Sequence, residues 1–137
     1  MPYNPAEGFN RIMPGRHYED VAAALEWLGK AFGLQEVLRW TGPQTGRVHH
    51  AEMRFGDNAF VELSDSRENE GLLVIVDDVE AHFANAKAHG AEIVSEPEDK
   101  PWGLRQYACR DFAGKNWGFG QWIRDVAPED WGAEAVS

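Results

Sequence analysis

Cysteine is nearly absent from this sequence, and long apolar runs are missing altogether. Cys109 is the one cysteine among 137 residues, so the chain cannot close a disulfide within itself. A chain without disulfides suits a reducing compartment, and we expect Cys109 to be a buried structural thiol rather than an activated nucleophile. No apolar stretch approaches the roughly 20 residues of a membrane-spanning helix, and residues 1–5 lack the basic start of a signal peptide. We therefore expect a cytoplasmic protein without a membrane partner.

Positive charge is also scarce. The chain has 13 Lys and Arg residues against 23 Asp and Glu residues, which gives a formal net charge of −10. A nucleic-acid partner is not expected, because phosphate backbones are bound by clustered Lys and Arg. An acidic surface raises the local concentration of cations and would suit a cationic ligand, although a solvated, solubilising surface explains the same charge more simply.

Two segments of the chain are alike. Tyr18–Val21 opens a helical stretch that ends at Gly33, and Val76–Val79 opens another that ends at Gly90. A β-like run follows each of them. The similarity indicates a duplicated module, and a duplicated half-domain must bury its sheet against its twin or against a second chain. We expect such pairing to create a symmetric cleft, which is where ligands bind.

Hydrophobic spacing and turn residues predict the same βαβββ order in both modules. Asp20 is a good helix N-cap and Gly33 a good helix stop. The predicted helices cover residues 21–32 and 79–89; the predicted strands cover 11–18, 34–41, 48–55, 59–64, 71–76, 93–96, 104–110 and 115–123. The chain divides into a tail over 1–10, modules over 11–66 and 67–123, and an acidic tail over 124–137 in which Trp131 is a possible anchor. The fold class is α+β, with all of these parts in one domain.

Strands 48–55 and 59–64 alternate in a way that assigns their faces. The faces predicted to pack on the helices carry Ala51, Met53, Phe55, Ala59, Val61 and Leu63; the opposite faces carry His50, Glu52, Arg54, Phe60, Glu62 and Ser64. Aromatic and charged groups on one face are unusual for a core and natural for a ligand cleft.

Four passages give the sequence a resemblance to a known superfamily. They are Tyr18–Val21 with Glu26–Leu28 and Ala31–Gly33; His50–Gly56; Val76–Val79 with Ala88–Ala91; and Arg110–Gly114 with Trp117–Gly120. Over roughly residues 11–123 the chain resembles the vicinal oxygen chelate superfamily of glyoxalase I, bleomycin resistance proteins and extradiol dioxygenases. The resemblance implies curved mixed sheets around a cleft. It is more informative about the fold than about the function, since one scaffold hosts several chemistries.

The resemblance also implies where a metal would bind. The metal enzymes of the superfamily carry His, Glu or Gln on the first and last strand of each module. The matching positions here are Met13, Glu62, Gly71 or Leu72, and Gly118, of which Glu62 alone can coordinate a metal. The histidines form no spaced cluster; they are His17, His49, His50, His82 and His89. We therefore expect no metal and no cofactor.

Strand alternation and the superfamily pattern together select the candidate ligand-binding residues. In the last hairpin the pattern places Asn116, Gly118, Gly120 and Trp122 toward the cleft and leaves Trp117 and Phe119 for the core, while Trp27 is also assigned to packing. Tryptophan faces attract planar rings and cations. Glu62 could instead form a structural salt bridge with Arg54 or Arg105, and His50 could hold the strand register. The candidates are Trp40, His50, Glu52, Phe60, Glu62, Trp102, Arg105, Tyr107 and Trp122.

Three functions fit these observations. The first is a homodimeric, metal-independent binder that sequesters an antibiotic or another planar or cationic compound, as the resemblance to bleomycin resistance proteins implies. The second is an enzyme of the same superfamily, a lyase, isomerase or dioxygenase. This enzyme would recruit metal through Glu62 with His50 or Glu52, or would use Glu62 as a base. The third is a partner-binding or regulatory module without a small ligand.

Overall fold

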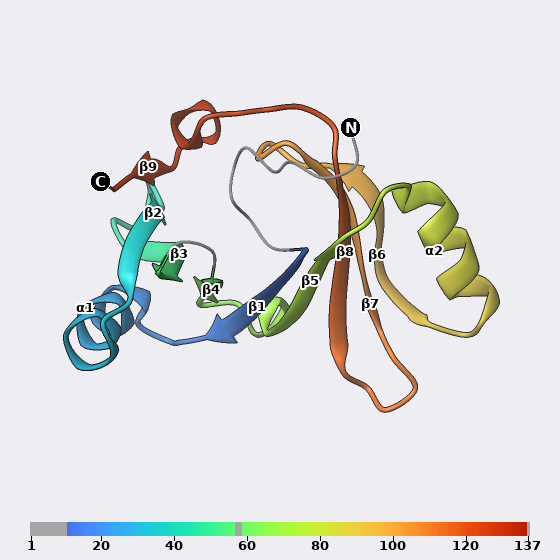
Figure 1. Cartoon of the computed structure of the whole chain (residues 1–137), viewed down its shortest axis with the longest axis horizontal. Helices are drawn as coiled ribbons and strands as arrows, with labels where there is room; N and C mark the ends of the chain where they lie inside the picture. The colour runs from blue at the N-terminus through green and yellow to red at the C-terminus, as the bar shows by residue number, and fades with distance from the viewer. Residues whose placement is uncertain (1–10, 57–58, 137) are drawn as a thin grey trace.

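The computed structural model describes residues 11–56 and 59–136, and these residues form two similarly built halves (Figure 1). The first half contains β1 (Ile12–His17), α1 (Val21–Phe32), β2 (Gln35–Thr41), β3 (Val48–Phe55) and β4 (Ala59–Ser64). The second contains β5 (Gly71–Ile75), α2 (Val79–Ala88), β6 (Glu92–Asp99), β7 (Leu104–Arg110) and β8 (Asn116–Trp122). The predicted βαβββ order is confirmed in both modules. Neither helix of the described residues is long and apolar enough to span a membrane.

The two modules join edge to edge within one chain. Strand β1 pairs antiparallel with β5, with Met13 opposite Leu73 and Gly15 opposite Gly71. The described strands form one mixed sheet in the order β6-β7-β8-β5-β1-β4-β3-β2-β9. The first strand of each module runs parallel to its last strand, so β1 pairs with β4 and β5 with β8. The β1–β5 pair, called the seam below, therefore makes one continuous sheet from two copies of a module.

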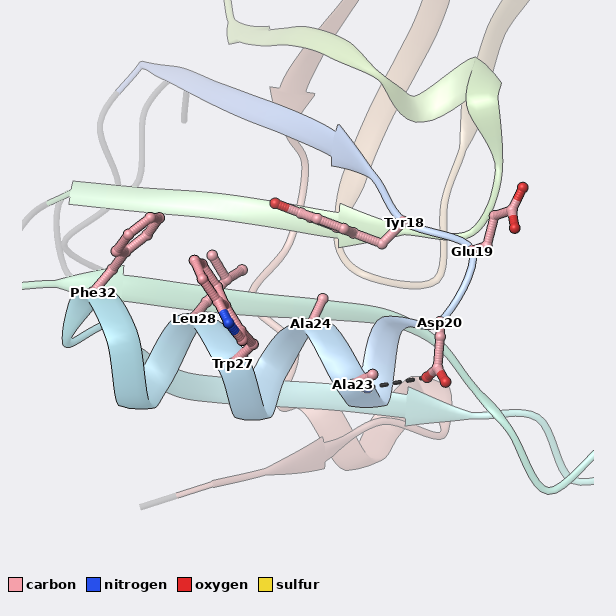
Figure 2. Close-up of a pocket in the computed structure, with 8 residues that line it drawn as sticks. All are labelled: Tyr18, Glu19, Asp20, Ala23, Ala24, Trp27, Leu28 and Phe32. Atoms are coloured by element: carbon pink, nitrogen blue, oxygen red, sulfur yellow. Dashed lines mark hydrogen bonds between the residues drawn. The ribbon is translucent and has the colours of Figure 1, made fainter.

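Helix α1 begins and ends where the sequence predicts. The Asp20 carboxylate accepts a hydrogen bond from the Ala23 backbone N–H at 3.0 Å (Figure 2), and Gly33 ends the helix with φ of 76°. An N-cap carboxylate satisfies an otherwise unpaired N–H of the first turn, and glycine adopts a left-handed conformation without strain. The buried side of α1 packs on the sheet through Val21, Ala24, Leu25 and Leu28 against Ala51, Met53 and Leu63.

Helix α2 covers the other module in the same way. Asp78 caps it by accepting from the Ala81 N–H. Its buried Val79 packs with Tyr107 and Cys109, and Trp117 and Phe119 complete this cluster. The predicted core positions of Trp117 and Phe119 are confirmed. The predicted buried state of Cys109 is also confirmed, and burial raises the pKa of its thiol.

Two segments differ from their predictions. Strand β6 continues through Pro97 to Asp99, where a loop was expected. Strand β6 is at the edge of the sheet, and proline is tolerated there because a backbone position that faces solvent needs no N–H to pair with a neighbouring strand. The acidic tail contains a 3₁₀ helix, η3 (Pro128–Trp131), and a strand, β9 (Glu134–Ala135), which pairs with the outer edge of β2. We call residues 124–136 the C-terminal strap. The predicted tail over residues 1–10 and the turn residues Asp57 and Asn58 lie outside the described residues.

Two glycines meet at the seam. A Cβ atom on Gly15 would collide with the backbone carbonyl of Asn69, and one on Gly71 would collide with that of Asn116. Gly71 also has φ of 151°, which disfavours other residues. Because both residues lack a side chain, β1 can lie against the segment that precedes β5, and β5 can lie against β8.

Replacing Gly71 with alanine should therefore destabilise the fold. Backbone strain alone costs about 1–3 kcal/mol, and the clash adds to it, so we expect Tm to fall by at least roughly 5 °C. The control is Gly29→Ala inside α1, where a Cβ meets only an ordinary contact and should stabilise the helix by about 0.5–1 kcal/mol. Thermal unfolding of the two variants measures the difference. A Gly71→Ala protein that melts with the wild type would contradict the close approach of Gly71 to Asn116 of β8.

Candidate functional site

The sheet face opposite the helices, called the inner face below, carries most of the predicted site. In β3, Ala51 and Met53 pack against α1, so His50 and Glu52 point to the inner face. In β4, Val61 and Leu63 pack against α1, which places Phe60 and Glu62 on the inner face. Phe55 is an exception to the predicted packing face, because its side chain is 61% exposed near the end of β3.

Two carboxyl groups lie across from each other on this face. Glu52 is directly opposite Glu62 in the β3–β4 register, and Glu52 is only 8% exposed. Burial raises the pKa of Glu62 above its ordinary value, and the nearby His50 acts in the opposite direction. Directly opposed strand residues have Cβ atoms about 5 Å apart, so two charged carboxylates here would repel each other. Burial and this opposition therefore both disfavour the charged form of Glu62.

The predicted salt-bridge role of Glu62 does not occur. Among the described residues, Glu62 forms no ion pair with Arg54 or Arg105. Trp40 lies opposite His50 in the β2–β3 register, and its ring lies 5.6 Å from that of His49. His50, Trp40, Phe60 and Glu62 are all half-buried, so these inner-face groups keep partial access to solvent.

Two tryptophans lie on the inner face of the second module. Trp122 is opposite Leu104, and the next inner positions of β8, Gly120 and Gly118, are opposite Gln106 and Ala108. The expected inward placement of Gly118, Gly120 and Trp122 follows from this register, because Tyr107 and Cys109 occupy the helix side. Trp102, in the loop before β7, donates its indole N–H to the side-chain oxygen of Gln106 at 2.8 Å.

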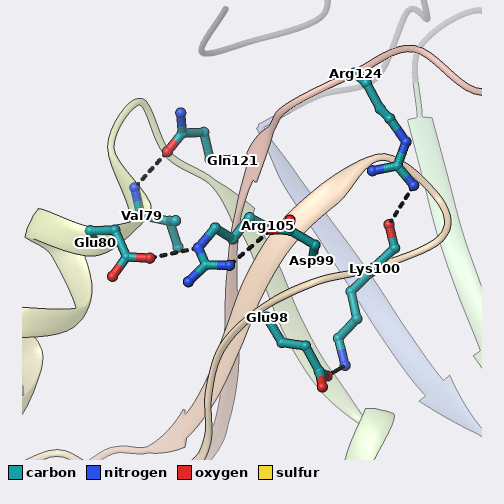
Figure 3. A network of polar contacts seen from close by, with 8 residues as sticks. All are labelled: Val79, Glu80, Glu98, Asp99, Lys100, Arg105, Gln121 and Arg124. Carbon is teal, nitrogen blue, oxygen red and sulfur yellow. Dashed lines mark hydrogen bonds and ion pairs between the residues drawn. The ribbon is translucent and has the colours of Figure 1, made fainter.

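Arg105 and Tyr107 do not belong with the other candidates. Tyr107 is fully buried beneath α2 and hydrogen-bonds His82 at 2.6 Å, and burial raises the pKa of Tyr107 to about 12. Arg105 lies between Glu80 of α2 and Asp99 of β6, at 2.6 and 2.9 Å (Figure 3). Alternation separates the two faces of β7 but does not say which faces the helix. The large ring of Tyr107 decides this, because it completes the core under α2.

Trp131, the possible anchor of the acidic tail, connects the two modules. Its ring lies 5.8 Å from that of Trp102 and 6.4 Å from that of His50, so this one strap residue contacts both modules. The next residue, Gly132, lies close to the Trp40 indole. The sequence did carry a signal for this segment, because Pro128 at the start of a turn and Gly132 just after it are typical helix boundaries.

The inner face does not fit the metal centre of the superfamily. The register places Met13, Leu73 and Gly118 in one row across the seam, with Glu62 beside Gly15 on the neighbouring strand. Leu73, rather than Gly71 or Leu72, is the second-module residue of that row. Three of these four side chains offer no nitrogen or oxygen donor. Within residues 11–56 and 59–136, no three His, Cys, Asp or Glu residues gather to hold a metal ion.

The raised pKa of Glu62 predicts a pH-dependent stability. The folded state favours the neutral carboxyl, so this stabilisation is complete below the unfolded pKa of about 4.3 and is lost as pH rises through the folded pKa. Glu62→Gln keeps the shape without the ionisation, so it should unfold at higher temperature than wild type near pH 8 and should lose this advantage near pH 4. Thermal unfolding across that pH range tests this. The control is exposed Glu96→Gln, and curves for Glu62→Gln that run parallel to wild type would contradict the burial of Glu62.

Comparison with known proteins agrees with this architecture. Residues 9–119 match the sequence profile described as Glyoxalase/Bleomycin resistance protein/Dioxygenase superfamily. The Mycobacterium bovis protein Mb0911c, which is itself uncharacterised, is 30% identical over 130 residues, covering 84% of this chain and 85% of that protein.

The first two of the following solved structures share the fold of this chain. A member of the same superfamily from Vibrio splendidus 12B01 has a TM-score of 0.64 at 16% identity, covering 82% of this chain and 98% of that one. Methylmalonyl-CoA epimerase from Mycobacterium tuberculosis has a TM-score of 0.55 at 15% identity, covering 86% and 85%. TioX from Micromonospora sp. ML1 is 32% identical, covering 84% and 98%, with a TM-score of 0.35. From the profile match and the mycobacterial relative, the chain belongs to the glyoxalase/bleomycin resistance protein/dioxygenase superfamily.

Proposed function

We propose that this protein is a metal-independent binder that sequesters a planar or cationic small molecule at its inner face. The main support is the acidic pair of Glu52 and Glu62 beside His50, placed on the same sheet face as half-buried tryptophans. A carboxyl group kept partly out of water attracts a cation more strongly than one in bulk solvent, because the effective dielectric is lower.

The tryptophans supply the second part of the recognition. Trp102 and Trp131 meet edge to face at 67°, and Trp131 lies next to His50. Rings in this arrangement offer flat apolar surface and a negative face to a planar cation. Sequestration needs no reactive group, so the proposal requires nothing beyond the side chains present. An antibiotic with a planar, positively charged part is one compound of this class.

The proposal also predicts that ligand binding is coupled to the release of a proton. A cation beside Glu62 stabilises its charged form, so binding should release a proton at pH values where the folded carboxyl is partly protonated. Proton release distinguishes a cation held at the acidic pair from a neutral molecule held by stacking alone.

The binding prediction uses a planar organic cation identified by quenching of tryptophan fluorescence, together with its uncharged analogue. Loss of one stacking ring in Trp122→Ala or Trp131→Ala should weaken binding about two- to thirtyfold. Glu62→Gln should weaken the cation more than the analogue, and the difference should shrink at high salt. Titration calorimetry in two buffers of different ionisation enthalpy measures affinity and proton release together.

Trp27→Ala is the matched control for these variants, because this tryptophan lies on α1 outside the inner face. It should bind the cation like wild type. Equal affinity of all the variants for both compounds would place the ligand elsewhere.

Metal content distinguishes the proposed binder from an enzyme of the same superfamily. The row of Met13, Leu73 and Gly118 supplies no donors, so the purified protein should carry far less than one equivalent of Zn, Ni, Mn or Fe per chain. Elemental analysis after purification without chelators makes this measurement. About one equivalent of metal per chain in the wild type, absent from Glu62→Gln, would support the enzyme function instead.

A further inference from the structure

A hydroxyl, an imidazole and a carboxylate are hydrogen-bonded in a chain at the start of β3. The Thr45 hydroxyl oxygen lies 2.6 Å from Nε2 of His49, and Nδ1 of His49 lies 2.6 Å from the Asp65 carboxylate. None of these residues belongs to the acidic pair or to the tryptophans of the proposed ligand site. A base within hydrogen-bonding distance of a hydroxyl, and oriented by a third group, is the arrangement that activates a nucleophile.

Backbone hydrogen bonds hold the segments that carry these three side chains. The Asp65 N–H donates to the carbonyl oxygen of His49 at 3.1 Å, immediately after β4 ends. In the turn between β2 and β3, the Gly42 N–H donates to the carbonyl oxygen of Arg47 at 2.8 Å, which closes the turn that carries Thr45. Both neighbours of His49 are therefore positioned by the sheet and its turn rather than by their own side chains.

The imidazole is enclosed, whereas the hydroxyl is accessible. A Cβ atom on Gly42 would lie 2.7 Å from both His49 Nε2 and Thr45 Oγ1, so any side chain there would displace one of them. The Trp40 ring lies 5.6 Å from the His49 ring. The side chains of His49 and Asp65 are only 24% and 23% exposed, while Thr45 is exposed. A substrate can therefore reach the Thr45 oxygen while the base behind it stays in place.

The partners of His49 decide which of its nitrogens carries the proton. A carboxylate only accepts hydrogen bonds, so Nδ1–H donates to Asp65. In the neutral imidazole Nε2 is then the acceptor, and the Thr45 O–H donates to it. The Thr45 oxygen also accepts from the Arg47 backbone N–H at 3.2 Å, which stabilises negative charge on that oxygen as its proton leaves. This direction of hydrogen bonding is the one that general-base catalysis requires.

We propose that Thr45, His49 and Asp65 form a catalytic site that hydrolyses activated carboxylic esters through an acyl-threonine. Thr45 Oγ1 bonds to the ester carbonyl carbon while its proton passes to His49 Nε2. The bond from that carbon to the leaving oxygen then breaks, and His49 gives the proton to the leaving group. Water attacks the acyl-threonine in the same way, which releases the carboxylic acid and restores the hydroxyl. One ester and one water thus give one acid and one alcohol, and Asp65 positions His49 without reacting.

Hydrolysis of 4-nitrophenyl acetate by the full chain tests the proposal. Mass spectrometry of acid-quenched protein should find the acetyl group on the peptide that contains Thr45. General-base catalysis contributes about 10²–10⁴-fold, so Thr45→Val and His49→Gln should each slow the protein-catalysed release of 4-nitrophenolate at least about a hundredfold. The double variant should be no slower than either single variant, because the residues act as a unit. Thr45→Ser keeps the hydroxyl and should remain active.

Two exposed residues outside the triad supply matched controls. Thr41→Val makes the same substitution as Thr45→Val on β2, and His89→Gln removes an exposed imidazole beyond the end of α2. Both variants should hydrolyse the ester like wild type. Unchanged circular dichroism verifies that each variant folds.

Asp65→Asn tests the positioning role. An asparagine amide can donate to Nδ1, which moves the proton of the neutral imidazole to Nε2 and removes the acceptor of the Thr45 hydroxyl. Nitrogen-15 NMR of the neutral His49 ring should therefore show an unprotonated Nε2 in wild type and a protonated Nε2 in the variant, and acetylation should slow with this change. An acetyl group found only on lysine or histidine side chains would overturn the proposal. A Thr45→Val protein that hydrolyses the ester as fast as wild type would overturn it equally.

Discussion

The antiparallel pairing of β1 with β5 is the contact on which the rest of the molecule depends. Gly15 and Gly71 are paired there, and each is closely approached by the backbone of a neighbouring segment, Gly15 by Asn69 and Gly71 by Asn116. This pairing converts two small modules, each with one helix, into a continuous sheet with both helices outside. It also sets Met13 beside Leu73, in the row where the metal enzymes of this superfamily carry their ligands. The seam thus builds the inner face and fills its centre with apolar residues.

The remaining polar groups of the inner face are displaced from that centre into the first module. Glu52, Glu62 and His50 lie on β3 and β4, while Trp102 and Trp122 come from the second module. The C-terminal strap connects the two sides, since it leaves β8, places Trp131 between His50 and Trp102, and ends by pairing with β2. A strap held at its end by a two-residue strand can open more easily than the sheet it crosses.

Local rules predicted most of the fold from the sequence. The cap at Asp20, the stop at Gly33 and the alternation in β3 and β4 depend on neighbouring residues, and the structure confirms them. Side chains whose positions depend on residues far away in the sequence were harder to place. Arg105 and Tyr107 were assigned to the ligand because β7 alternates, but its two faces differ only in whether α2 lies above them. Trp27 was assigned to packing, yet it is 58% exposed on α1.

The strap illustrates the same limit. Its composition is acidic and rich in small residues, which is typical of a tail, and its order depends on pairing with β2 some ninety residues earlier in the chain. The seam was likewise left open by the sequence, since identical module edges could pair within or between chains. Local sequence specifies the modules, and long-range contacts decide how the modules meet.

The central claim is that burial disfavours the charged form of Glu62 in the free protein and that a bound cation favours it. Carbon-13 NMR of the glutamate side-chain carboxyl groups, with Glu62 assigned by its loss in Glu62→Gln, tests this most directly. We expect the Glu62 resonance to titrate at higher pH than the exposed glutamates and its titration to shift to lower pH when a planar cation is added. A Glu62 resonance that titrates with the exposed glutamates and does not respond to the cation would contradict the account.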